Sequence, residues 1–217
     1  VNLPRNSKSM AGIGLKVASV AIFVMMSTLI KSTDGIPLGQ IIFFRSFFAM
    51  VAILCYFSWC GQFSGIFHTR HGVSHFWRGM VGVCAMTMTF LALTLLPLPE
   101  AIALNYASPL IAVVLGAVIL RETVRFYRWT AVLVGLLGVF IIIWPRLTLL
   151  TDGSAGYSEA IGALAALGGA TLAAFAMMLV RHLVQTERTP TIVVYFSLSA
   201  SIISLVSLPF GWVMPSW

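Results

Sequence analysis

The residue with the clearest capacity for chemistry is Arg45, a cation inside the long apolar stretch that follows Pro37. A helical rise of about 1.5 Å per residue places it roughly 12 Å inside a helix that starts at this proline. A lipid-facing arginine at that depth costs a few kcal/mol, so we expect its side chain to face protein and to meet an anion. Two roles stay open. Arg45 contacts a substrate carboxylate or phosphate, or it pairs with helix carbonyls or Glu100 while snorkelling outward.

A second group of polar residues belongs to the helix expected at 99–120. Glu100 opens that helix, where a negative charge is favourable at the N-terminus; the alternative is a gate partner or protonatable group near Arg45. Pro109 leaves the carbonyl of Asn105 without its helical donor and predicts a kink. A packed kink and a binding site both remain open, because polar groups in hydrocarbon need protein or a wet cavity. The other candidates for a polar lining are Tyr106, Ser108, Thr87, Tyr195, Ser197 and Ser201.

The remaining ionisable residues indicate no catalytic or metal chemistry. Glu122 lies in a short basic turn, where we expect it to cap the next helix or to hold the turn. His68, His71 and His75 cluster without a nearby cysteine or carboxylate, so a basic loop at lipid headgroups is favoured over zinc. The three cysteines have no metal-ligand spacing. We expect no catalytic residues, no metal, no cofactor and no enzyme activity.

Composition indicates the class of protein that positions these residues. Of the 217 residues, 59% are hydrophobic and only 9% are charged, whereas about a quarter of a soluble domain is charged. The apolar runs are about 20 residues long and do not alternate with period two, which predicts spanning helices rather than a β-barrel. We expect an all-α polytopic membrane protein with seven spans, at about residues 10–31, 38–60, 75–95, 99–120, 128–145, 160–182 and 190–211.

The basic residues between these spans predict the orientation of the chain. Ten lysines and arginines, among them Arg78, fall on the side of the N-terminus and two on the other side, which places the N-terminus in the cytoplasm. The net charge of +7 is therefore a topology signal, and nucleic acid is not expected as a partner. The tryptophans fall at the expected ends of spans, as in an aromatic belt.

The chain also matches itself. At an offset of 153 residues the second span aligns with the seventh, with Pro37 on Pro190, Phe43 on Phe196, Ser46 on Ser199 and Trp59 on Trp212. Because five spans separate the copies, they must have opposite orientation, which predicts inverted five-helix repeats in a 5+5 arrangement. We expect a first repeat at residues 1–146, a linker at 147–159 and an incomplete second repeat at 160–217. A complete protein of this kind would have about ten spans.

The order of these features resembles the drug/metabolite transporter superfamily, in particular its EamA-type members with two five-helix repeats. The motifs that carry the resemblance are Lys31, Pro37 with FFRSFFA at 43–49, FLALTLLPLPEAIALNYASPL at 90–110, Glu122, Trp129 and GLLGV at 135–139. The resemblance implies a ten-helix transporter of the bacterial inner membrane. The present chain departs from that pattern, because it stops after the seventh span.

We therefore expect a secondary transporter that moves a small metabolite, such as an amino acid, a nucleotide-like compound or a vitamin, by alternating access. The expected partners are this substrate, a coupling ion such as a proton, the lipid bilayer and a second copy of the chain in a homodimer. Two alternatives from other classes stay open: a seven-span receptor, sensor or non-transporting scaffold, and an intramembrane enzyme. The lack of a soluble output segment disfavours the receptor, and the lack of paired ionisable groups at depth disfavours the enzyme.

Overall fold

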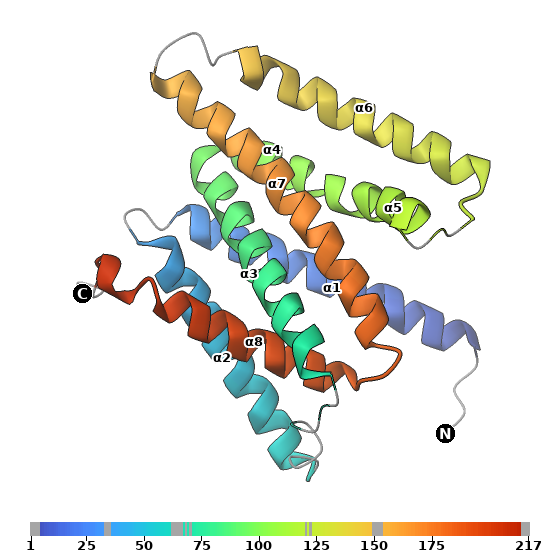
Figure 1. Cartoon of the computed structure of the whole chain (residues 1–217), viewed down its shortest axis with the longest axis vertical. Coiled ribbons are helices and arrows are strands. Elements are labelled where there is room, and N and C mark those ends of the chain that lie inside the picture. The colour runs from blue at the N-terminus through green and yellow to red at the C-terminus, as the bar shows by residue number, and fades with distance from the viewer. Residues whose placement is uncertain are drawn as a thin grey trace. The chain divides into compact units, whose positions relative to one another are not determined.

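In the part of the chain that the structure describes, every regular element is a helix. The computed structural model describes residues 5–32, 36–61, 67, 69, 71–119, 121, 123–148 and 154–213. The helices are α1 (Arg5–Lys31), α2 (Leu38–Trp59), α3 (Gly72–Leu95), α4 (Leu98–Asn105), α5 (Ala107–Ile119), α6 (Phe126–Thr148), α7 (Ser154–Leu183), α8 (Thr189–Leu205) and the 3-10 helix η3 (Leu208–Phe210). The expected all-α class is confirmed (Figure 1).

Six segments of the described chain are long and apolar enough to cross a membrane. They are Gly12–Lys31, Leu38–Trp59, Gly72–Leu95, Leu98–Ile119, Phe126–Pro145 and Tyr157–Leu183. These segments correspond to the first six of the seven predicted spans, and α4 and α5 together form the fourth. The chain is thus a multi-pass membrane protein. The helix α8 has 17 residues, fewer than the roughly 20 that a typical crossing needs.

The predicted seventh span extends to residue 211, but the α-helix ends earlier, at Leu205. Pro209 supplies the physical reason, because its ring would clash with the carbonyl of Leu205, four residues before it, and it has no amide to donate. The single turn of η3 follows instead. Gly211 then has a φ of 86°, in the left-handed region that glycine adopts without steric cost.

Another proline accounts for the interruption between α4 and α5. Pro109 has no amide N–H, so the carbonyl of Asn105 has no helical donor. The regular helix stops at Asn105, and Tyr106 forms a tight turn in which its amide donates to the carbonyl of Ile102 at 3.3 Å. The polar groups of this segment therefore lie at a break in the helix.

The chain forms two compact units, which we describe separately. The first unit, Val1–Asp34, contains α1. Within α1 the hydroxyl of Ser27 donates to the carbonyl of Phe23 at 2.9 Å. Such bonds to the preceding turn allow hydroxyl side chains in an apolar span. The second unit, Gly35–Trp217, contains the other helices.

The second unit is built around α3 and α7, which make its most extensive helix contact. Gly162, near the start of α7, lies against Leu95 and Leu96 at the end of α3, so the two helices run antiparallel. Further along, Gly169 lies against Thr89. A Cβ at Gly169 would be 3.1 Å from the backbone nitrogen of Thr89. The absence of a side chain here lets the two backbones approach closely.

The remaining helices of this unit attach to α3 or α7. Helices α4 and α5 lie on α7, and α6 lies on α5 and α7. Helix α8 packs on α2 and α3, and it crosses beside α2 (Figure 1). Both helices of the expected second repeat, α7 and α8, therefore pack on helices of the expected first repeat.

The α3–α7 contact predicts opposite effects of one substitution at two glycines. Gly138→Ala adds a Cβ that meets nothing within 4 Å, so it should leave stability unchanged or raise it, because alanine favours helix. Gly169→Ala places its Cβ 3.1 Å from the Thr89 nitrogen and should cost about 1–3 kcal/mol through overpacking. The measurement is thermal unfolding of the purified chain in detergent. Equal melting temperatures for the two variants would contradict this account of the contact.

Candidate functional site

Arg45 lies on α2 with its guanidinium against α3. One guanidinium nitrogen contacts the sulfur of Met86. The guanidinium carbon also lies 5.7 Å from the centre of the Phe90 ring, within the range of a cation–π contact. The side chain as a whole keeps an exposed surface. Arg45 thus reaches a neighbouring helix without being enclosed by it.

The other candidates of the first half lie on α3, on α4 and around the break between α4 and α5. Glu100 is half-buried in the first turn of α4, where its charge is favourable beside the helix N-terminus. Asn105 is half-buried at the end of α4, and Tyr106 and Pro109 are exposed. Thr87 is exposed, and its hydroxyl donates to the carbonyl of Val83 in its own helix at 2.9 Å. Glu122 lies outside the described residues.

The candidates on α8 point to a site that the sequence did not single out. Ser197 is buried, with 3% of its surface exposed. The hydroxyl of Tyr195 donates to the carbonyl of Phe67 at 3.1 Å. The Tyr195 ring stacks on His75 of α3, with centroids 4.7 Å apart and an interplanar angle of 28°. Tyr195 therefore joins α8 to α3 and to the segment that precedes α3.

Arg78, one turn after His75 on α3, also faces α8. Its guanidinium carbon lies 4.3 Å from the centre of the Phe196 ring. The guanidinium rests above Gly82, because a Cβ at Gly82 would collide with Nη1 of Arg78 and with the Phe196 ring. Gly82 follows Arg78 by one helical turn, so the arginine side chain is directed into the span and away from the near end of α3.

His75 and Arg78 share an uncommon feature, which is buried polar nitrogen atoms without a hydrogen-bond partner. Within the described part of the chain, both ring nitrogens of His75 and the Nε and Nη1 atoms of Arg78 are in this state. His75 is 3% exposed. Sequence reasoning assigned Arg78 to the basic residues that set orientation and His75 to a solvated loop. The usable signal was the spacing of Arg78 and Gly82, which leaves room for a guanidinium on the helix surface.

A second set of contacts ties the opposite end of α8 to α2. The side-chain amide of Gln40 donates to the carbonyl of Val213 at 2.8 Å, and the amide of Val213 donates back to Gln40 Oε1 at 3.1 Å. The ring of Trp212 lies 5.2 Å from Phe43 and 6.1 Å from Phe44, between centroids. We name these five residues the α2–α8 contact set.

The contacts near the start of α8 form a comparable group. Besides the Tyr195–His75 and Arg78–Phe196 pairs, the hydroxyl of Thr69 donates to Glu187 at 2.8 Å. We name the group the α3–α8 contact set, and its members are Phe67, Thr69, His75, Arg78, Glu187, Tyr195 and Phe196. Helix α8 is therefore held at its start against α3 and at its end against α2.

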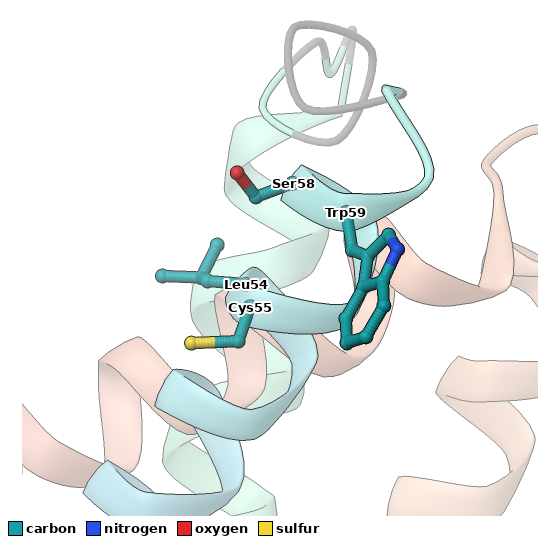
Figure 2. Close-up of a pocket in the computed structure, with 4 residues that line it drawn as sticks. All are labelled: Leu54, Cys55, Ser58 and Trp59. Carbon is teal, nitrogen blue, oxygen red and sulfur yellow. The ribbon is translucent and has the colours of Figure 1, made fainter.

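A hollow of about 500 Å³ lies at the C-terminal end of α2, lined by Leu54, Cys55, Ser58 and Trp59. Figure 2 shows Trp59 directed away from the other three side chains. Because all four belong to one helix end and Trp59 is 93% exposed, the hollow is an open depression. Binding pockets for small molecules are instead concave and enclose most of the ligand. Among the described residues no group of three or more His, Cys, Asp or Glu could hold a metal ion.

Comparisons with known proteins find that the sequence of this chain is similar to those of membrane transporters. The model of the EamA-like transporter family matches residues 10–144. The chain is similar to the pseudopaline exporter CntI of Pseudomonas aeruginosa, with 29% identity over 205 residues. It is also similar to the S-adenosylmethionine uptake transporter of Rickettsia prowazekii, with 28% identity over 107 residues, and to the riboflavin transporter of Vibrio cholerae, with 27% identity over 183 residues.

Each match covers a larger share of this chain than of the relative. In the same order they cover 93%, 49% and 84% of the chain, and 66%, 36% and 58% of the relatives. The chain therefore spans less than two thirds of the length of the curated relatives it matches. No solved structure matches the chain significantly.

The α2–α8 contact set predicts a local effect of Gln40→Ala. This change removes both hydrogen bonds to the backbone of Val213 and leaves its amide unpaired, at a cost of about 1–3 kcal/mol. Hydrogen–deuterium exchange of the peptide that contains Val213 should become about tenfold faster or more, because this segment opens more often. Gln185→Ala, at an exposed turn position, is the matched control. Unchanged exchange at Val213 would show that Gln40 does not hold this segment.

Proposed function

Because the chain belongs to the EamA-like transporter family, we propose that it carries out secondary transport of a small metabolite by alternating access. Its relatives include a pseudopaline exporter, an S-adenosylmethionine uptake transporter and a riboflavin transporter. These cargoes support a small polar or amphipathic substrate for this chain. The relatives include an exporter and an uptake transporter, so they do not determine the direction of transport.

The observation that carries the proposal is that α8 is tied to the first half by two separate contact sets. The α2–α8 contact set lies where α2 begins, and the α3–α8 contact set lies where α3 begins. Alternating access requires a substrate site that opens to each face of the membrane in turn. Release of one contact set while the other holds would expose the surface beside α8 to one face of the membrane only.

The architecture proposed for this motion is a pair of inverted five-helix repeats, at residues 1–146 and from 160 onward, joined by the linker at 147–159. Its support is the offset of 153 residues that aligns Phe43 with Phe196 and Trp59 with Trp212. The antiparallel packing of α2 and α8 is compatible with this symmetry, since equivalent spans of inverted repeats cross the membrane in opposite directions. A proton as coupling ion and a homodimer belong to the same proposal.

The proposal also assigns roles to the candidate residues. Arg45 would contact an anionic group of the cargo, and Asn105, Tyr106, Thr87, Tyr195 and Ser197 would line its path. Glu100 would act as an outer partner or protonatable group. Pro109 would maintain the break between α4 and α5, and Glu122 would cap the helix that follows it.

The alternatives differ in their support. The matched family is one of transporters, which argues against an intramembrane enzyme. A receptor or a non-transporting scaffold would keep the two contact sets closed and would move no solute. Mass spectrometry of metabolites inside and outside cells, with and without the gene that encodes this chain, tests the transport proposal. The expected result is a change in the distribution of one class of small metabolite.

Transport should depend on Arg45. Arg45→Ala is expected to reduce transport at least tenfold while the protein still reaches the membrane, because an anionic cargo would lose a charge-assisted hydrogen bond. Arg128→Ala removes the same charge at an exposed position of α6 and is the control. Membrane abundance is measured together with the metabolite change. Parallel loss of folded protein and transport would assign Arg45 a structural role.

The proposed orientation, with a cytoplasmic N-terminus and a location in the bacterial inner membrane, predicts a labelling pattern. A cysteine at position 153 should react with a membrane-impermeant maleimide added outside the cell, and a cysteine replacing His71 should react only after the membrane is opened. The background needs serine at Cys55, Cys60 and Cys84, which are free and exposed. The reverse pattern would overturn the orientation.

A further inference from the structure

The α3–α8 contact set contains the strongest unexplained feature of the molecule. Arg78 lies within a membrane-spanning segment, and two of its guanidinium nitrogens are buried without a partner in the described chain. A buried polar group without a hydrogen bond is costly, and a charged one more so. A basic side chain near a helix end normally avoids this cost by extending toward the headgroups. Arg78 instead folds over Gly82, deeper into the span.

The neighbours of Arg78 do not replace the missing acceptor. The guanidinium carbon of Arg78 lies 4.3 Å from the centre of the Phe196 ring. The ring face attracts the cation, but the ring does not replace a hydrogen-bond acceptor for the guanidinium nitrogens. His75 lies one turn earlier on α3 and carries two unpartnered nitrogens of its own. On α8, the buried hydroxyl of Ser201 also lacks a partner. The described chain thus has unsatisfied polar groups on both α3 and α8, and those of His75 and Arg78 lie against α8.

A second cation, the guanidinium of Arg45 on α2, also lies against α3. The guanidinium of Arg78 rests at the level of Gly82, and that of Arg45 contacts Met86 and Phe90. Gly82, Met86 and Phe90 are spaced by four residues, so they form one ridge of α3. The two guanidinium groups are therefore separated by roughly 6–12 Å along the axis of α3. Two cations at this separation in a weakly polar medium repel each other, and an anion between them would reverse the effect.

We propose that the surface of α3 between His75, Arg78 and Arg45 binds an oxyanion of the cargo, a carboxylate or phosphate, when α8 moves away. This inference rests on the proposed transport function and names the chemical class of its substrate. In the present arrangement Phe196 covers Arg78, so the site is closed. Movement of α8 exposes the guanidinium nitrogens, and the anion supplies the acceptors that they lack. The ligand therefore favours the open state, because it binds that state more tightly.

A binding measurement that needs no transport tests the inference. The purified full chain is kept in dodecyl maltoside micelles without phospholipid, and its thermal unfolding is followed with increasing citrate or inorganic phosphate at constant ionic strength set by chloride. A ligand that binds only the folded state raises the melting temperature in a saturable way. We expect such a rise in the original chain. We expect Arg78→Gln to need at least tenfold more anion for the same rise, which corresponds to the loss of one strong contact.

Two matched pairs of variants control for the loss of a positive charge and for the addition of a methyl group to a glycine. Arg128→Gln removes an exposed charge on α6 and should leave the anion dependence unchanged. Gly82→Ala keeps the arginine but places a Cβ in the space of its guanidinium, so it should also weaken anion binding. Gly138→Ala, with nothing within 4 Å of the added Cβ, should have no effect. If Arg78→Gln does not fold, the Gly82→Ala and Gly138→Ala pair decides.

Three outcomes overturn the inference. The first is no stabilisation by citrate or phosphate. The second is equal stabilisation of the original chain and the Arg78→Gln and Gly82→Ala variants. The third is stabilisation by added phosphatidylglycerol alone, which would assign the site to a lipid headgroup. Anion binding in a chain that changes no metabolite would preserve the site and refute transport, so the two proposals fail separately.

Discussion

The close antiparallel contact of α3 and α7 is the constraint on which the second unit depends. Lipid tails are as apolar as leucine side chains, so helices in a membrane gain little from hydrophobic burial and associate through close packing. Gly162 and Gly169 bring the backbone of α7 against α3. The same helix carries small side chains that are almost fully buried, among them Ala163, Ala166, Ala170 and Ala174. The helices α4, α5 and α6 then attach to α7, and α2 and α8 attach to α3.

The contacts of α8 are of a different kind from those of α7. Its two ends are held by hydrogen bonds and ring contacts, such as the Gln40–Val213 pair and the Tyr195–His75 stack. Individual contacts of these types contribute about 0.5–1.5 kcal/mol each, and their groups can exchange partners without leaving a void. Separating α7 from α3 would instead expose a long interlocked surface. A conformational change in this unit is therefore expected at α8 before α7.

The sequence predicted the elements of this fold better than the directions of their side chains. Apolar length and composition indicated six of the spans, and Pro109 indicated a kink at the place where the structure has a break after Asn105, because both effects are local. Pro209 could have predicted the end of α8 by the same rule. Arg78 was assigned to the basic residues near a membrane surface. Its inward direction depends on Gly82 and on Phe196 of a distant helix, a combination that no local rule contains.

The proposed repeats relate two of these contacts to each other. Phe43 and Phe196 align at the offset of 153 residues, and each lies in the first half of its helix, α2 or α8. Phe43 packs on Trp212, whereas Phe196 lies under Arg78.

The tryptophan that aligns with Trp212 is Trp59, and it is 93% exposed. Phe43 thus meets an aromatic ring, whereas the aligned Phe196 meets the guanidinium of Arg78 on α3. The Phe43–Trp212 contact leaves no hydrogen-bonding group of the two facing rings in need of a further partner. The guanidinium of Arg78 against the Phe196 ring still lacks hydrogen-bond acceptors. Opening of this contact to an anion therefore gains more free energy than opening of the Phe43–Trp212 contact.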